Sequence, residues 1–231
     1  MTLILSLIVL LLIVFLLLAL VLLQRHQRSG QLQQLADRLT LSYRPFASLS
    51  QPLRQARFLI FSVGQMRYFR HLLEGSYQPQ TSHFQQQPLA LTQRRLNVFD
   101  YGLVSDKGTH NQTLMLFACS LNCGCFRIQP HAWLHADVFA DSEPLLRLSQ
   151  GQYPPALHSR QLFGQHPARL TALLTPQVQH WLLAHPHLHI EFSNGILLLY
   201  RRAHRLAVED IEAALEAGCQ LAELLQLSER Q

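Results

Sequence analysis

One apolar run near the N-terminus constrains this chain more than any other feature. Residues 3–23 carry no charge and a single hydroxyl group, that of Ser6. At ~1.5 Å per residue, a helix of this length spans roughly 30 Å, which matches the hydrocarbon core of a bilayer. A helix also satisfies its own backbone hydrogen bonds, as lipid requires. The sequence therefore predicts a transmembrane anchor at residues 1–24, with the bilayer as a partner through residues 3–23.

A cleaved secretory signal peptide is the main alternative for this run. Such a peptide has a basic start, a shorter apolar stretch and a cleavage site with small residues. Here Met1 and Thr2 have uncharged side chains, and no pair of small residues follows the run. We therefore expect the anchor to stay uncleaved.

The charges beside the run predict its orientation. Arg25 and Arg28 follow it closely, whereas no basic side chain precedes it. Because positive charge is retained on the cytoplasmic side, these two membrane-flanking residues predict an N-terminus outside and a C-terminal domain in the cytoplasm. The expected location is the bacterial inner (plasma) membrane, as a single-pass protein.

Charge and cysteine content exclude two classes of protein. The net charge is +5, from 19 basic and 14 acidic residues, without the concentrated basic face typical of nucleic-acid binding. The four cysteines do not form the framework of a small disulfide-rich secreted domain. We expect free thiols in a reducing compartment and no nucleic-acid partner.

Two hairpins are the clearest strand signals. Residues 95–104 and 113–119 are rich in β-branched and aromatic side chains, with turn-forming residues at 105–108. Residues 188–192 and 196–200 flank a Ser-Asn-Gly turn, a strong hairpin signature.

Helical spacing of apolar residues appears in four segments. A juxtamembrane helix is expected at residues 25–39, and two short helices at 168–174 and 176–183. Thr175 is placed to cap the latter helix, with Pro176 at its favoured first position. An amphipathic helix is expected from 207 to 227, with acidic residues in its first turns.

These elements predict an α+β fold. The soluble domain, residues 40–231, would hold an antiparallel sheet packed by helices on one face and closed by the C-terminal amphipathic helix. A small curled sheet capped by that last helix, as in pleckstrin-homology domains, is the alternative.

Three cysteines and one histidine form the best candidate metal site. Cys119, Cys123 and Cys125 lie near His131, and thiolate and imidazole are the ligands that zinc prefers. Their spacing matches no standard zinc motif, and Cys119 ends an apolar strand where a small thiol packs well. We therefore predict no bound metal or cofactor.

Three histidines at every second position, His185, His187 and His189, could share one face of a strand. The same alternation supports a simpler interpretation. If Leu188, Ile190 and Phe192 form the buried face, the residues between them, including Glu191, point to solvent.

Asp100, Ser105 and His110 fall within one predicted hairpin and suggest a hydrolase. However, the chain has no Gly-x-Ser-x-Gly elbow, phosphate-binding loop, His-Glu-x-x-His motif or dinucleotide fingerprint. We predict no catalytic residue.

Two groups of arginines could contact anionic lipid headgroups or be solvated surface charges. They are Arg201, Arg202 and Arg205, and upstream Arg54, Arg57, Arg67 and Arg70.

Two short motifs carry a resemblance to a family. Residues 97–101 read Asn-Val-Phe-Asp-Tyr, and residues 173–178 read Leu-Leu-Thr-Pro-Gln-Val. In order and pattern the chain resembles bacterial single-pass membrane proteins of unknown function, although Gly102 and Leu103 stand where those proteins often have another aromatic residue. The resemblance supports the topology and implies no activity or catalytic residues.

The resulting hypothesis is a membrane-tethered, non-enzymatic interaction module that binds a protein partner or an anionic lipid surface. The alternative is a membrane-anchored hydrolase or metal-dependent enzyme. It would use Asp100 and His110, or the cysteines with His131.

Overall fold

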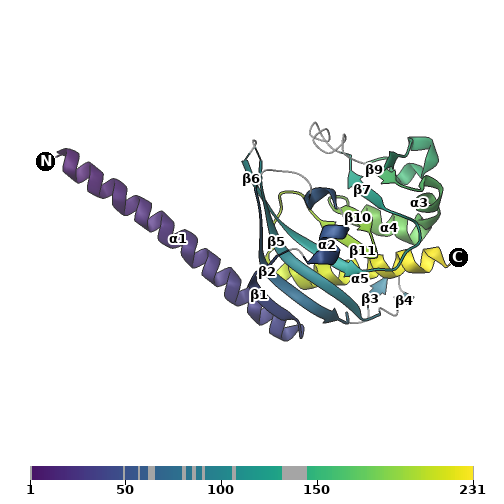
Figure 1. The fold of residues 1–231 in the computed structure, drawn as a ribbon, viewed down its shortest axis with the longest axis horizontal. Helices are drawn as coiled ribbons and strands as arrows, with labels where there is room; N and C mark the ends of the chain where they lie inside the picture. The colour runs from purple at the N-terminus through teal and green to yellow at the C-terminus, as the bar shows by residue number, and fades with distance from the viewer. Residues whose placement is uncertain are drawn as a thin grey trace.

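The computed structural model describes residues 2–48, 50–56, 58–61, 66–79, 82–84, 87–89, 92–105, 108–131 and 145–230. A long N-terminal helix, α1, projects from a domain built around one large sheet (Figure 1). The helices are α1 (Thr2–Arg38), α2 (Gln51–Gln55), α3 (Pro167–Leu173), α4 (Pro176–Ala184) and α5 (Val208–Glu229), with 3-10 turns η1 (Leu59–Phe61), η3 (Gln150–Gln152) and η4 (Pro155–Leu157). The strands are β1 (Ser42–Phe46), β2 (Met66–Tyr77), β3 (Ser82–Phe84), β4 (Gln87–Leu89), β5 (Arg94–Ser105), β6 (Gly108–Ala118), β7 (Phe126–Pro130), β8 (Leu146–Arg147), β9 (Arg160–Gly164), β10 (His189–Ser193) and β11 (Ile196–Tyr200).

The main sheet has nine strands in the order β1-β2-β5-β6-β11-β10-β7-β9-β8. Each neighbouring pair is antiparallel. The sheet is open, because β1 and β8 lie at its two ends rather than beside each other. The strands β3 and β4 form a separate two-stranded ribbon.

The two predicted hairpins are present. β10 pairs with β11 around Asn194 and Gly195, whose φ angles of 49° and 75° are the left-handed values that a tight two-residue turn requires. β5 pairs with β6 from Leu96↔Phe117 to Ser105↔Gly108, and residues 106–107 of that turn lie outside the described residues.

Helices cover one face of the sheet. The last turns of α1, together with α3, α4 and α5, pack against every second residue of the strands and form the larger core. Its fully buried members include Leu32 of α1, Phe117 of β6, Trp181 of α4 and Leu215 of α5. The apolar periodicity seen in these segments therefore marks the side that faces the sheet.

The opposite face is also covered, by α2 and η1, and Figure 1 shows α2 in front of the sheet and α5 behind it. A second core lies here, in which Phe61 of η1 contacts the rings of Phe69 and Tyr101. Tyr101 also donates a hydrogen bond to the carbonyl of Ile60 at 2.7 Å. The sequence signals described above assign no element to these residues, so this covering layer was not predicted.

The prediction of a transmembrane helix over residues 3–23 requires correction. Across the residues that the structure describes, no helix combines the length and apolar character needed to cross a bilayer. The helix continues from the apolar run to Arg38 without a break, and Leu32, Leu35 and Ala36 of its last turns belong to the core of the domain. The apolar run is thus the first part of a longer helix whose last turns pack on the sheet. The predictions of a single-pass protein and of bilayer contact through residues 3–23 are therefore not supported. The predicted cellular location and orientation are not tested by this finding and stay predictions.

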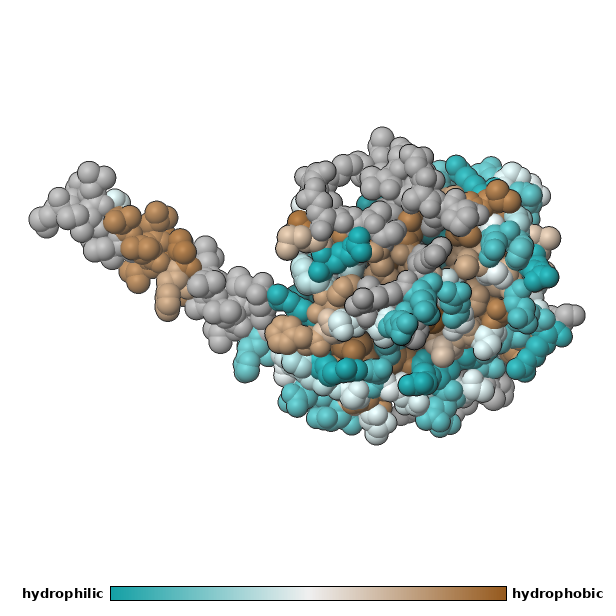
Figure 2. Space-filling model, viewed as in Figure 1, coloured by the Kyte–Doolittle hydropathy of each residue, from teal (hydrophilic) through white to brown (hydrophobic). Residues whose placement is uncertain are grey.

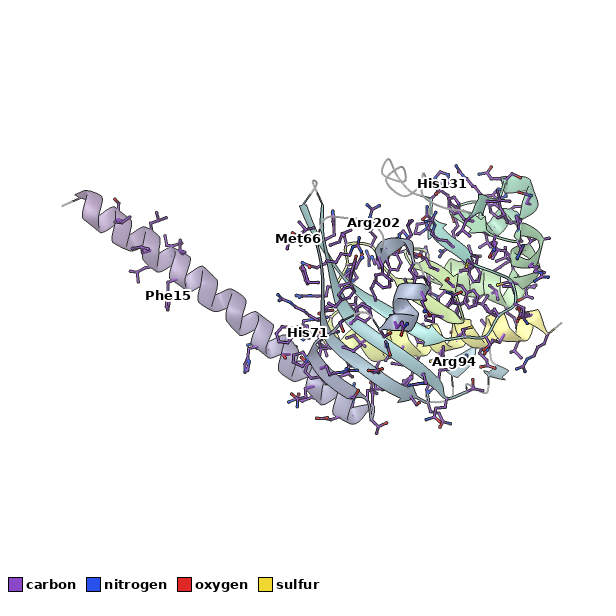
Figure 3. All side chains as sticks on the ribbon, in the orientation of Figure 1. Phe15, Met66, His71, Arg94, His131 and Arg202 are labelled. Carbon is purple, nitrogen blue, oxygen red and sulfur yellow. The ribbon has the colours of Figure 1, made fainter. Side chains whose placement is uncertain are left out.

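Several apolar side chains of α1 are exposed in the monomer. They gather on the part of the helix that projects from the domain, as the brown surface in Figure 2 shows, and Phe15 is labelled there in Figure 3. Phe15 is 69% exposed, whereas Leu32 of the same helix is 1% exposed.

Two helical glycines give a paired test of the packing. A Cβ at Gly218 of α5 would lie 2.2 Å from Cζ of Phe117, whereas a Cβ at Gly30 of α1 would meet nothing within 4 Å. We expect Gly218→Ala to lower the free energy of unfolding by about 1–3 kcal/mol, because overpacking outweighs the better helix propensity of alanine. Gly30→Ala should instead raise it by about 0.5–1 kcal/mol.

Chemical denaturation of the two variants and the parent chain measures both effects. A Gly218→Ala variant as stable as the parent would show that α5 does not lie this close to β6.

Candidate functional site

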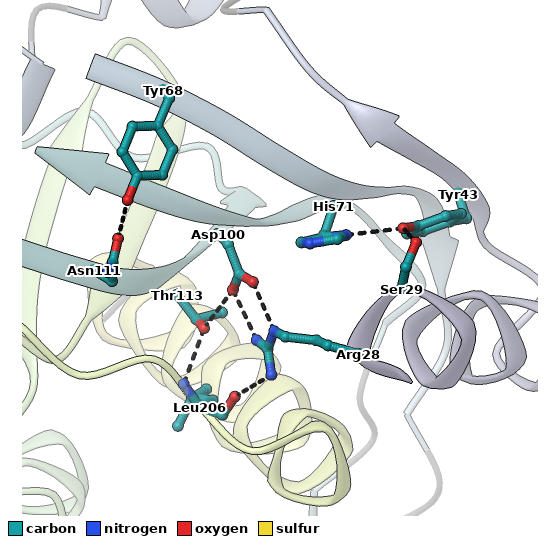
Figure 4. Close-up of polar contacts among 9 residues, drawn as sticks. All are labelled: Arg28, Ser29, Tyr43, Tyr68, His71, Asp100, Asn111, Thr113 and Leu206. Atoms are coloured by element: carbon teal, nitrogen blue, oxygen red, sulfur yellow. Dashed lines mark hydrogen bonds and ion pairs between the residues drawn. The ribbon is translucent and has the colours of Figure 1, made fainter. Parts of the chain in front are cut away.

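A buried ion pair joins α1 to the sheet. The guanidinium group of Arg28 donates from Nε to Oδ2 of Asp100 at 2.7 Å and from Nη2 to Oδ1 at 2.8 Å (Figure 4). The two side chains are only 11% and 10% exposed. A two-pronged pair with this little solvent is among the stronger and more directional polar contacts available to a protein.

The same pair reaches a third segment of the chain. Arg28 Nη1 donates to the carbonyl of Leu206 at 2.9 Å, just before α5. Thr113 Oγ1 donates to Asp100 Oδ1 at 3.0 Å and accepts from the backbone N–H of Leu206 at 3.0 Å. Asp100 is therefore occupied by structural partners, and Arg28, expected at a membrane flank, lies inside this junction. The side chain of Arg25 lies outside the described residues.

A histidine stands beside the junction in an unusual backbone conformation. His71 has a φ of 55° at the point where the register between β2 and β5 shifts. Its Nδ1 lies 2.8 Å from the hydroxyl of Tyr43, which in turn lies 2.6 Å from Ser29 Oγ (Figure 4). Burial lowers the pKa of His71, and the nearby Arg28 opposes protonation further, against the opposite effect of Asp100.

A small cavity opens on the other face of the sheet, between η1 and the strands β5, β6, β7, β10 and β11. Its volume is about 50 Å³. The lining residues are Leu59, Ile60, Leu103, His110, Gln112, Arg127, Gln129, His189, Tyr200 and Arg202. It is the strongest candidate for a binding site, because it combines a partly apolar wall with several buried polar groups.

Glu191 bonds to two residues that line this cavity, and its burial corrects the interpretation of the histidine repeat. It was expected to point to solvent, yet it is 5% exposed. Its carboxylate accepts a hydrogen bond from Tyr200 Oη at 2.9 Å and another from the backbone N–H of Leu59 at 3.1 Å. The expectation was wrong because it assumed that only one face of the strand is covered.

His189 takes part in the same arrangement. Its ring stacks on Tyr200 with centroids 4.9 Å apart. Burial, together with the charges of Arg202, Arg127 and Arg160, lowers the pKa of His189 to about 4. His189 is therefore neutral at pH 7. The other two histidines of the repeat precede β10 and do not line the cavity.

The structure does not gather the predicted metal ligands into one site. Cys119 Sγ points to the carbonyl of Ala222 in α5 at 3.8 Å, whereas Cys125 Sγ donates to Ser193 Oγ at 3.4 Å. His131 is exposed beside a different hollow, of about 310 Å³, that Arg147 and Arg160 also line. Among the described residues, no group of three or more His, Cys, Asp or Glu side chains is arranged to hold a metal ion.

The three residues of the suggested hydrolase are also separated. Asp100 faces the helices, because Val98, two residues before it on the same side of β5, belongs to the larger core. His110 lines the cavity on the opposite face of the sheet. The side chain of Ser105 lies outside the described residues. A strand places successive side chains on opposite faces, so Asp100 and His110 cannot act on one substrate atom.

Among the described side chains of the two arginine groups, Arg202 alone lines the cavity. Arg201 and Arg205 are exposed. Upstream, Arg67 and Arg70 lie on β2, and the side chains of Arg54 and Arg57 lie outside the described residues.

Sequence reasoning missed the polar groups that matter most here. Arg127, Gln112 and Glu191 are 3%, 3% and 5% exposed, although each alternates with apolar neighbours as a solvent-facing residue does. Arg127 of β7 and Glu191 of β10 face each other in the paired strands. Their opposite charges were the signal that the sequence offered.

Comparison with known proteins shows the fold. No protein-family model matches the chain, and no curated protein matches it. The structure is similar to the crystal structure of the mycobacterial trehalose monomycolate transport factor A, TtfA, with a TM-score of 0.58. The alignment covers 86% of this chain and 94% of that chain at 9% identity, so the likeness concerns the fold alone. The family resemblance drawn from the two short motifs stays a prediction.

Two arginines of α1 test the junction. Removing one partner of a buried pair leaves an uncompensated charge, so Arg28→Ala should lower the free energy of unfolding by about 3–5 kcal/mol. Arg38 pairs with Glu212 at 2.6 Å, but its side chain is 63% exposed. Arg38→Ala should therefore cost less than about 1 kcal/mol. Urea denaturation of both variants measures the difference, and equal effects would contradict the proposed role of the Arg28–Asp100 pair.

The cysteines can be ranked by thiol reactivity. Burial raises the pKa of Cys119, Cys123 and Cys219 to about 12, so their thiols stay protonated and shielded. We expect the folded chain to react quickly with a disulfide reagent at Cys125 alone, and Cys125→Ser to remove the fast phase. Full reaction should need denaturant. Fast modification of Cys119 or Cys123 in the folded state would restore the case for a thiolate site.

Proposed function

We propose that this protein is a non-enzymatic interaction module that acts in lipid transport, with lipid as its ligand. The observation that carries the proposal is the common fold with a mycobacterial trehalose monomycolate transport factor, which extends over 86% of this chain and 94% of that one. Coverage of both chains almost from end to end means that the likeness concerns the whole architecture and not one recurring motif.

The geometry gives this proposal further support over the enzymatic alternative. A hydrolase would need Asp100 and His110 on the same side of the sheet, and they lie on opposite faces. A metal enzyme would need Cys119, Cys125 and His131 to converge, and each has a different local environment. A catalytic base must also lie within hydrogen-bond reach of the group it acts on.

A transfer assay tests the proposal. Donor vesicles would carry a fluorescent phospholipid with a quencher, and unlabelled vesicles would accept it. We expect the full-length chain to accelerate the gain of fluorescence, and mass spectrometry to recover the lipid chemically unchanged. The double variant Cys125→Ser, His131→Ala should transfer lipid as well as the parent chain, because neither side chain lines the cavity between η1 and the strands.

Two outcomes would overturn the proposal. One is a chain that neither accelerates transfer nor retains lipid after purification. The other is a cleaved lipid product that is lost in the double variant or in a separate His110→Gln variant, which would favour the enzyme.

A further inference from the structure

The cavity under η1 has two unlike sides. Leu59 and Ile60 of η1 and Leu103 of β5 form an apolar wall. The facing strands contribute Gln112 and Gln129, whose amide groups can donate hydrogen bonds, and Tyr200, whose hydroxyl proton goes to Glu191. A site with one apolar and one polar side suits a ligand that is itself divided in this way.

The charge of the lining is positive. It includes Arg127 and Arg202 and, among the ten described residues that line it, no carboxylate. Arg127 is held in place, because its guanidinium carbon lies 4.4 Å from the centroid of the Phe163 ring and its side chain is almost fully buried. Burial is the main cause of the lowered pKa of His189, and Arg202 and Arg127 lower it further.

A carboxylate lies close to this lining. Glu191 is the register partner of Arg127, and it accepts hydrogen bonds from Tyr200 and from the backbone of Leu59. This contact links η1 to the sheet and fixes the distance between the apolar and polar walls. The two arginines of the lining outnumber this carboxylate.

The size of the cavity limits what can enter. A single water molecule needs about 10–15 Å³ of cavity volume. A cavity of about 50 Å³ accommodates one compact polar group, whereas a whole drug-sized ligand needs about 300–1,000 Å³. Any alkyl chain attached to the bound group must therefore leave along the apolar wall.

We infer that this cavity binds the oxyanion headgroup, a phosphate or carboxylate, of an amphiphile whose alkyl chain runs past Leu59, Ile60 and Leu103. The inference rests on the proposed function and names its site. Arg127 and Arg202 supply the charge, since a guanidinium group matches the geometry of an oxyanion. Gln112 and Gln129 supply neutral donors.

Calorimetric titration of the full-length chain with three probes tests the inference. The probes are octyl phosphate below its micellar concentration, inorganic phosphate and octanol. We expect octyl phosphate to bind, inorganic phosphate to bind at least about tenfold more weakly for lack of the alkyl contact, and octanol not to bind, where tenfold corresponds to ~1.4 kcal/mol. Equal affinity for the two phosphates would overturn the assignment to an amphiphile and leave a site for free phosphate.

Three variants locate the binding. Arg202→Gln removes a charge at the exposed rim and should weaken octyl phosphate binding about tenfold. Gln129→Glu is nearly isosteric, places a carboxylate in the lining and should weaken binding by more. Arg201→Gln is the matched control, because Arg201 is an exposed neighbour that does not line the cavity, and it should bind as the parent does.

The outcomes separate this inference from the proposed function. If lipid transfer is intact but neither Arg202→Gln nor Gln129→Glu changes the affinity for octyl phosphate, the headgroup site is wrong and the transport role stands. If octyl phosphate binds as expected and the chain accelerates no transfer, the headgroup site stands and the transport role is wrong.

Discussion

The two-pronged ion pair between Arg28 and Asp100 is the contact that fixes the position of α1 on the domain. It joins residues 72 positions apart, and through the carbonyl of Leu206 it also fixes the chain where α5 begins. Charges this far out of water stabilise the fold only when every remaining hydrogen bond is made. Here both oxygens of Asp100 and the hydroxyl of Thr113 are used, so α1 and the segment just before α5 are held at one point.

Covering the sheet on both sides has a different consequence. Every second strand residue packs against helices, and its neighbours meet α2 and η1 instead. Polar residues placed under that second cover must find partners or lose the free energy of solvation. Glu191 does so with Tyr200 and the backbone of Leu59, and the cavity lies beside this pair, where packing between η1 and the strands is incomplete.

Local signals predicted the elements whose cause is local. Asn194 and Gly195 adopt the positive φ angles of the hairpin that the sequence predicts there, and Pro176 begins α4. Thr175 occupies the N-cap position, although its hydroxyl bonds to Ser228 of α5 rather than to its own helix. The transmembrane prediction was wrong because it considered the apolar run alone. The same helix continues to its last turns, where Leu32 and Ala36 pack in the core of the domain. Partners such as Arg28 and Asp100, or η1 and Glu191, are set by the tertiary fold alone.

The buried polar groups of this protein are therefore used in two ways. At the junction, each charge is matched by an opposite charge or a donor, and nothing is left over to act on a ligand. Under η1, Glu191 bonds to both walls, and the lining carries arginines, glutamines and a tyrosine. Burial, aided by nearby arginines, lowers the pKa of His189 to about 4, so this ring is neutral at pH 7 and adds no charge to those of the arginines. Unlike the junction, this part of the fold therefore keeps polar groups that face a cavity.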